Sequence, residues 1–318
     1  MRLYPRTPIV FSFALVCGAL VSVLTGCNPP AATSDATTAS SGASSSDTGG
    51  GSSSGGEAGK ALVIEGSDTL LPLAQKWAED FKKQNPDANI TVSGGGSGQG
   101  IKSLINGTAT IADASREADD KEKAQAKGKG FELTETAVAR DGITIIVNPS
   151  NSIKSLTLAQ VKDIYTGKVN NWKEIGGSDL KITASGRDSA SGTYKYFQED
   201  VLGKNEKYRA DMASTPSNNA IANNVAQQKG GIGYIGVAYA TEFTKAGKVR
   251  EVPVAFKVGE QPVLPTSENI LNGKYPISRA LYNYTKNSPE GLAKSYLDYV
   301  TGPEGQKVVT EQGYVTLK

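Results

Sequence analysis

The stretch GRDSASGTYKYF, residues 186–197, combines one arginine with three small hydroxyl side chains and a glycine, directly before a predicted helix. Arginine presents a rigid, planar set of charged donors that suits an oxyanion. The first turn of a helix adds backbone N–H groups that have no partner inside the helix. The stretch therefore makes Arg187, Ser191, Gly192 and Thr193 candidate ligands of an anion.

Two more stretches have a similar composition and the same place between a predicted strand and a predicted helix. Residues 66–70 read GSDTL, and residues 94–100 read GGGSGQG. Each offers small hydroxyl side chains and unobstructed backbone N–H groups at a helix N-terminus. A capping residue or a tight turn is the commoner reason for any one of them. Three such stretches with an arginine in one chain favour an oxyanion-binding function.

The remainder of the body, residues 61–318, alternates short apolar runs with helical patterns, which favours an α/β fold with mainly parallel sheets. A body of this length suits two lobes better than one core. The continuously apolar residues 142–147 are typical of a buried parallel strand. We predict strands at 61–65, 89–93, 110–112, 142–147, 181–184, 232–235, 252–256 and 277–284, and helices at 70–81, 101–105, 156–165, 289–300 and 303–312 and from residues 193 and 218.

The first sixty residues predict export of the protein. Arg2 and Arg6 precede an apolar run that ends in Leu-Thr-Gly before Cys27. This order is typical of a bacterial lipoprotein signal peptide, which is cleaved before the cysteine that then carries the lipid. We predict the signal peptide over residues 1–26 and a flexible Ser/Gly/Thr-rich tether over residues 27–60. An uncleaved anchor helix with an incidental cysteine is the alternative.

The body contains neither cysteine nor histidine, which excludes a disulfide framework, a thiol metal site and a Ser-His-Asp triad. Its carboxylates do not cluster at a metal-ligand spacing, so no metal is expected. Without the two signal arginines, 34 − 2 = 32 basic residues face 32 acidic ones, and no nucleic-acid-binding surface is expected. The glycine-rich stretch lacks the Gly-Lys-Ser/Thr of a nucleotide-binding loop.

Five motifs in order carry a resemblance to a known family. They are GSDT at 66–69, GGGSGQGIK at 94–102, IYTGKVNNW at 164–172, RDSASGT at 187–193 and GGIGYI at 230–235. Together they resemble the PstS family, the substrate-binding proteins of phosphate ABC transporters, across essentially all of the body. The order of five motifs is far more specific than any one of them.

The resemblance implies a two-lobed periplasmic-binding-protein clamshell. Each lobe would be a mainly parallel sheet flanked by helices, with the ligand in the cleft between the lobes. We place lobe 1 at residues 61–142 and 252–318 and lobe 2 at residues 143–251. The residues implied to contact phosphate are Ser67, Thr69, Leu70 through its N–H, Ser97, Arg187, Ser191, Gly192 and Thr193.

The implied function is high-affinity binding of inorganic phosphate and its delivery to the permease of an ABC transporter. The protein would be an extracytoplasmic monomer, lipid-anchored to the cell membrane, and periplasmic if the bacterium has an outer membrane. It would need no cofactor and would not be an enzyme.

One position departs from the family pattern. The loop after the third strand reads ADASR, with Arg116 where the best-known members carry an aspartate that accepts the proton of phosphate. Arginine adds anion affinity but cannot accept a hydrogen bond. We therefore expect Arg116 to be an anion ligand and Asp141 to be the acceptor, with Asp68 in reserve. The alternatives are a surface ion pair of Arg116 with Asp113 or Asp120, and a turn-capping role for Asp141.

Three other functions remain open from the sequence. The first is a binding protein for another oxyanion, such as sulfate, which lacks a proton near neutral pH. The second is a phosphatase, which the absence of histidine and of a carboxylate-rich metal site disfavours. The third is a receptor that senses phosphate without transporting it, because sensing and transport need the same cleft.

Overall fold

The computed structural model describes residues 61–317. The predicted signal peptide, Cys27 and the tether lie outside the described residues. Within the described residues, no helix is long and apolar enough to cross a membrane. All of the hydrophobic cores discussed below lie in this part of the chain.

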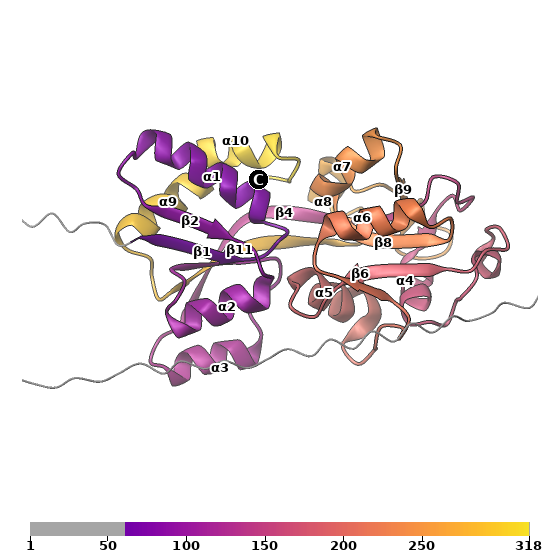
Figure 1. Cartoon of the computed structure of the whole chain (residues 1–318), viewed down its shortest axis with the longest axis horizontal. Coiled ribbons are helices and arrows are strands. Elements are labelled where there is room, and N and C mark those ends of the chain that lie inside the picture. Colours follow the sequence, from indigo (N-terminus) through magenta and orange to yellow (C-terminus); the bar gives the residue numbers. More distant parts are fainter. Residues whose placement is uncertain (1–60, 318) are drawn as a thin grey trace, which may run out of the picture. The chain divides into compact units, whose positions relative to one another are not determined.

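The strands and helices largely follow the predicted alternation (Figure 1). The strands are β1 (Leu62–Gly66), β2 (Ile90–Ser93), β3 (Ile111–Ala114), β4 (Leu133–Val147), β5 (Leu156–Thr157), β6 (Thr183–Arg187), β7 (Ala213–Thr215), β8 (Gly231–Gly236), β9 (Arg250–Val252), β10 (Val254–Ala255) and β11 (Ser278–Lys286). The α-helices are α1 (Leu71–Gln84), α2 (Ser97–Asn106), α3 (Asp120–Gly128), α4 (Leu158–Tyr165), α5 (Gly192–Tyr196), α6 (Asn218–Gln227), α7 (Val237–Lys245), α8 (Ser267–Leu271), α9 (Gly291–Thr301) and α10 (Pro303–Glu311). A 3-10 helix covers Trp172–Ile175, and a π-helix over Phe197–Gly203 continues α5.

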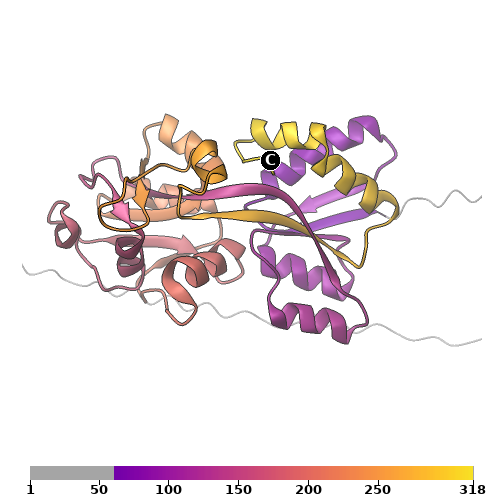
Figure 2. The ribbon, with the colours of Figure 1, turned by 180° about the vertical axis from the view of Figure 1, so that it is seen from behind.

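The described strands form one large sheet and one small pair. In the large sheet the order is β2-β1-β3-β11-β4-β8-β6-β7, with β9 also paired to β4, and the small sheet pairs β10 with β5. β1 is parallel to β2 and β3, and β6 is parallel to β7 and β8. The long strands β4 and β11 join these two parallel groups and run antiparallel to each other (Figure 2).

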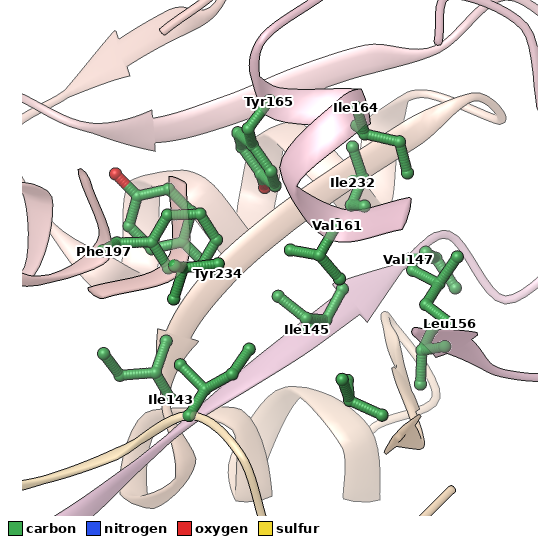
Figure 3. Close-up of a cluster of buried hydrophobic side chains, with 14 of the residues drawn as sticks. Ile143, Ile145, Val147, Leu156, Val161, Ile164, Tyr165, Phe197, Ile232 and Tyr234 are labelled. Carbon is green, nitrogen blue, oxygen red and sulfur yellow. The ribbon is translucent and has the colours of Figure 1, made fainter. Parts of the chain in front are cut away.

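Hydrophobic packing divides the body into two lobes. In lobe 1, α1, α9 and α10 pack against one face of β1 and β3, and α2 and α3 cover a second cluster that includes Ala112, Ala114 and Tyr284. In lobe 2 the main core contains Ile143, Ile145 and Val147 of β4 (Figure 3). The chain therefore has a two-lobed α/β architecture, with β4 and β11 contributing to both halves.

The apolar run at residues 142–147 is not a parallel strand, as predicted, but the second part of β4. It pairs antiparallel with β8 and with β9. Residues 143–147 are all buried, because the run lies between the main core of lobe 2 and the cluster under α6 and α7. A strand covered on both faces is continuously apolar whatever the direction of its neighbours, so this pattern did not report direction.

The chain returns to lobe 1 later than predicted. Val254, Ile270, Tyr275 and Ile277 pack in the same core as Ile143. β11, which pairs with β3 of lobe 1, begins only at Ser278. Residues 252–277, which the sequence assigned to lobe 1, thus belong with the core of lobe 2.

One buried carboxyl group lies beneath the sheet of lobe 1. Asp113 of β3 is opposite Asn283 of β11 and accepts a 2.5 Å hydrogen bond from its Nδ2. Burial raises the pKa of Asp113 to about 8, although the bond from Asn283 acts in the opposite direction. Among residues 61–317, Oδ1 of Asn283 is buried without a donor, which a protonated Asp113 could supply.

This pair predicts a pH-dependent stability. Unfolded Asp113 releases its proton near pH 4, whereas the folded group keeps it up to about pH 8. The free energy of unfolding should therefore fall as the pH rises through this interval. Asp113→Asn should remove this part of the dependence and make the variant the more stable protein at pH 8. Urea unfolding of both proteins from pH 4 to pH 9 measures it, and parallel curves would contradict the assignment.

Candidate functional site

Three loops with anion-binding composition lie at the carboxyl ends of parallel strands. Ser67–Leu70 follows β1, Gly94–Gly96 follows β2, and Asp188–Ser191 follows β6. Each of these loops leads directly into a helix: α1, α2 and α5 respectively. Ligands bind α/β sheets at this edge, where loop N–H groups and helix N-termini meet. The first two loops belong to lobe 1 and the third to lobe 2.

The structure brings these loops into contact across the two lobes. The Thr69 and Thr193 hydroxyl oxygens lie 3.0 Å apart. The backbone N–H of Gly98, in the first turn of α2, donates to the carbonyl of Ala190 at 3.3 Å. A Cβ added at Gly192 would lie 2.2 Å from Oγ of Ser97 and 2.6 Å from Oγ of Ser115. The structure thus brings the three predicted loops together at one place.

Arg187 also spans the two lobes. It is 1% exposed, and its Nη2 donates to Oδ2 of Asp68 at 2.6 Å. Oδ1 of Asp68 accepts from the backbone N–H of Gly95 at 3.0 Å. Nε of Arg187 is buried and has no hydrogen-bond acceptor among the described residues. A buried charged donor without an acceptor is costly, so this nitrogen indicates that the site accommodates an anion.

The other predicted ligands differ in whether their N–H and O–H groups already have hydrogen-bond partners. Oγ of Ser67 is buried without a partner among the described residues, and Ser97 exchanges a 3.2 Å hydrogen bond with Ser115. The Leu70 N–H already donates to the Ser67 carbonyl at 3.0 Å. Oγ of Ser191 caps α5 by accepting from the N–H groups of Thr193 and Tyr194.

Asp141 lies in a buried ion pair that the sequence analysis missed. Its partner is Arg279, which is directly opposite it in the β4–β11 ladder. Nη2 of Arg279 donates to Oδ2 of Asp141 at 3.1 Å, to Thr69 at 3.3 Å and to Thr193 at 2.8 Å. Nε and Nη1 of Arg279 are buried without acceptors among the described residues. A lone arginine inside the predicted strand 277–284 was the only sequence signal for it.

Burial dominates the electrostatics of this pair. It raises the pKa of Asp141 and lowers that of Arg279, while the opposite charge beside each group works against the shift. Oδ1 of Asp141 lies beside the backbone of Gly236 and Val237, without a donor that gives it a well-formed hydrogen bond. Oδ1 of Asp141 is therefore less firmly bonded than Oδ2, which Arg279 holds.

The guanidinium of Arg116 bonds to residues of lobe 1 rather than to the other candidate anion ligands. Its Nη1 and Nη2 donate to the two carboxylate oxygens of Glu122 at 2.8 and 2.7 Å, and Nη1 also donates to the carbonyl of Glu117. Neither Asp113 nor Asp120, the partners considered from the sequence, takes part in this ion pair. Arg116 and Arg279 both line a cavity of about 540 Å³ beside the site.

Comparisons with known proteins identify the family of this chain. The PBP superfamily domain matches residues 31–304. Phosphate-binding protein PstS of Bacillus subtilis (strain 168) is 36% identical over 260 residues, which is 81% of this chain and 81% of that protein. The Pseudomonas aeruginosa protein of the same name is 35% identical over 269 residues, covering 79% and 81% of the two chains.

A solved structure of a substrate-binding protein with bound phosphate, from Clostridium perfringens, superimposes with a TM-score of 0.72 at 34% identity. The match covers 81% of this chain and all of the solved one. This chain belongs to the PstS family. The resemblance first drawn from five motifs of the PstS family is confirmed by these comparisons.

The close approach at Gly192 gives a steric test of the site, because the PstS fold here leaves no room for a side chain between Ser97 and Ser115. We expect Gly192→Ala to hold the lobes apart and weaken phosphate binding about tenfold or more, since overpacking typically costs 1–3 kcal/mol. Calorimetric titration with phosphate measures the affinity. Gly128→Ala, where an added Cβ meets nothing within 4 Å, is the control. Equal phosphate affinities of both variants and the wild type would show that the lobes do not close with Gly192 against Ser97 and Ser115.

Proposed function

We propose that this protein captures inorganic phosphate outside the cytoplasm and delivers it to the permease of an ABC transporter. The observation that carries the proposal is the set of buried donors that lack acceptors within the described part of the chain, contributed by both lobes. They are Oγ of Ser67 in lobe 1, Nε of Arg187 in lobe 2, and Nε and Nη1 of Arg279 on the crossing strand. Such donors suit a small, fully enclosed oxyanion.

The proposed ligand set comes mainly from the three loops. Ser67, Thr69 and Ser97 would bind from lobe 1, with the Leu70 N–H shared between the anion and the Ser67 carbonyl. Arg187, Ser191, Gly192 and Thr193 would bind from lobe 2. Arg116 is left out of the set, because both of its terminal nitrogens donate to Glu122 and Nη1 donates to the Glu117 carbonyl as well.

Binding would be coupled to closure of the lobes. Thr69 and Thr193 approach each other only when the two lobes meet, and Arg187 reaches Asp68 across the same cleft. An anion that contacts donors of both lobes stabilises the closed arrangement over the open one. Release to a permease then requires the lobes to separate, and no covalent bond is made or broken.

The names of the relatives support phosphate as the ligand. The curated relatives reported above are called phosphate-binding proteins, and the Clostridium perfringens structure holds phosphate. A binder of another oxyanion, a phosphatase and a receptor that senses phosphate without transport are the alternatives that these relatives do not favour. Within residues 61–317, no group of three or more His, Cys, Asp or Glu side chains is placed to hold a metal ion.

Selectivity for phosphate over sulfate requires a hydrogen-bond acceptor for the proton of phosphate. We propose Asp141 for this role, because its Oδ1 lacks a donor with good geometry while its Oδ2 is held by Arg279. Both oxygens of Asp68 already accept hydrogen bonds, from Gly95 and from Arg187. Asp68 is therefore the second candidate.

The proposed location follows from the sequence of the first sixty residues. We propose that residues 1–26 are removed as a signal peptide and that a lipid on Cys27 anchors the protein to the membrane. Residues 27–60 would then tether a monomeric body near its permease.

Titration of the protein, purified in detergent, with phosphate and then sulfate at neutral pH tests the proposed function. Wild type should bind phosphate and not sulfate. Arg187→Ala should lose about a hundredfold or more in phosphate affinity, because it leaves a buried anion and Asp68 without their charged partner. Arg140→Ala, which removes an exposed arginine of β4, should bind as wild type does.

Two outcomes of this titration would contradict the proposal. Equal binding of both anions would indicate a general oxyanion trap, and near-native affinity of Arg187→Ala would move the site elsewhere. Asp141→Asn should narrow the preference for phosphate, whereas an unchanged preference would transfer the acceptor role to Asp68. Turnover of a chromogenic phosphate ester by the wild type would revive the phosphatase alternative.

The anchor is tested by Cys27→Ser. This change removes the proposed lipid attachment atom, so the protein should move from the membrane fraction to the soluble fraction. Membrane association that persists in Cys27→Ser would instead indicate an uncleaved anchor helix.

A further inference from the structure

Arg279 has an unusual position for a buried arginine. It lies on β11, one of the two strands that run through both lobes, and it is 7% exposed. Its Nη2 donates to Thr69 of lobe 1, to Thr193 of lobe 2 and to Asp141 of the other crossing strand. One nitrogen therefore links both lobes and both crossing strands.

A role in neutralising Asp141 does not explain why the other two guanidinium nitrogens of Arg279 are buried without acceptors among the described residues. That ion pair uses only Nη2, while Nε and Nη1 are buried without acceptors among the described residues. Each buried donor that lacks an acceptor costs free energy, and a charged donor costs more than a neutral one. A purely structural arginine would be expected to have these nitrogens satisfied by protein groups.

Lobe 2 also fixes the position of the guanidinium. Its central carbon lies 5.4 Å from the centre of the Tyr196 ring, and the Tyr196 hydroxyl donates to the carbonyl of Ser278 at 2.8 Å. An arginine held on an aromatic ring and by a carboxylate loses little freedom when it binds an anion. Tyr196 and Asp141 thus act as positioning residues for Arg279.

We propose that Arg279 is a second anion-binding arginine, which contacts the anion from the crossing strand while Thr69 and Thr193 contact it from the two lobes. The sequence suggested a second arginine in the site at position 116, but that guanidinium is committed to Glu122. Arg187 and Arg279 each use one nitrogen on a carboxylate and keep another for the ligand. This inference rests on the proposed function and adds a ligand to the same site.

The test compares Arg279→Gln with Arg140→Gln in the detergent-purified protein. Arg140 is the matched control because it lies on β4 next to Asp141, carries the same charge and is exposed. Calorimetric titration should show a loss of about thirtyfold or more in phosphate affinity for Arg279→Gln and none for Arg140→Gln.

Hydrogen exchange is a second measurement, and it reports closure of the lobes directly. The Gly98 N–H bonds to the Ala190 carbonyl across the lobes, so phosphate should slow hydrogen exchange at Gly98 in the wild type. At a phosphate concentration that saturates the wild type, the Arg279→Gln variant should lose this protection. Arg140→Gln should retain it.

Arg279→Gln leaves Asp141 buried without its partner and could fail to fold. The double variant Arg279→Gln with Asp141→Asn removes both charges, and Asp141→Asn alone is its reference. A further loss of about thirtyfold between these two supports the proposal. Equal affinities of the two, in a protein whose wild type binds phosphate, would overturn it. Absence of phosphate binding by the wild type would instead overturn the proposed function.

Discussion

The antiparallel pairing of β4 with β11 is the constraint on which the rest of the structure depends. Its register runs from Ser278 opposite Gly142 to Lys286 opposite Leu133, with one irregularity between Leu281 and Tyr282. The two strands connect the parallel strands of lobe 1 with those of lobe 2. They therefore place the carboxyl edges of both groups around one cleft, and the pairing sets Arg279 directly opposite Asp141 beside it.

The site balances charge within itself. Two arginines, Arg187 and Arg279, are each paired with one carboxylate, Asp68 and Asp141 respectively. Leaving a charge buried and unpaired would be strongly destabilising, so each ion pair allows an arginine to be buried before the ligand arrives. The free donors are Oγ of Ser67 and nitrogens of the two arginines, whereas Oδ1 of Asp141 is an acceptor without a well-formed hydrogen bond. This combination suits an anion that also carries a proton.

The loops of the site could be predicted from the sequence because their signals are local. Hydroxyl residues and glycines at the beginning of a helix indicate a helix N-terminus wherever the helix packs. The alternation of strands and helices gave the α/β class for the same reason. Only α3, α7 and α8 among the described α-helices escaped prediction, and the buried residue of α3 is Ala126.

The remaining features depend on pairs that are distant in the chain. Asp141 and Arg279 are 138 residues apart, and nothing near either residue reports their register. Arg116 pairs with Glu122, which also forms the capping box at the beginning of α3 together with Asp119. Because α3 consists mainly of polar residues, the sequence pattern did not predict this helix. The direction of residues 142–147 was hidden because both faces of that segment are covered.

A crystal structure of the protein grown with phosphate tests the central claim most directly. We expect one enclosed phosphate in contact with Thr69 and Thr193, with donors from Nε of Arg187, Oγ of Ser67 and the guanidinium of Arg279, while Arg116 stays on Glu122. Phosphate held by Arg116, or found only outside the cleft between the lobes, would contradict it.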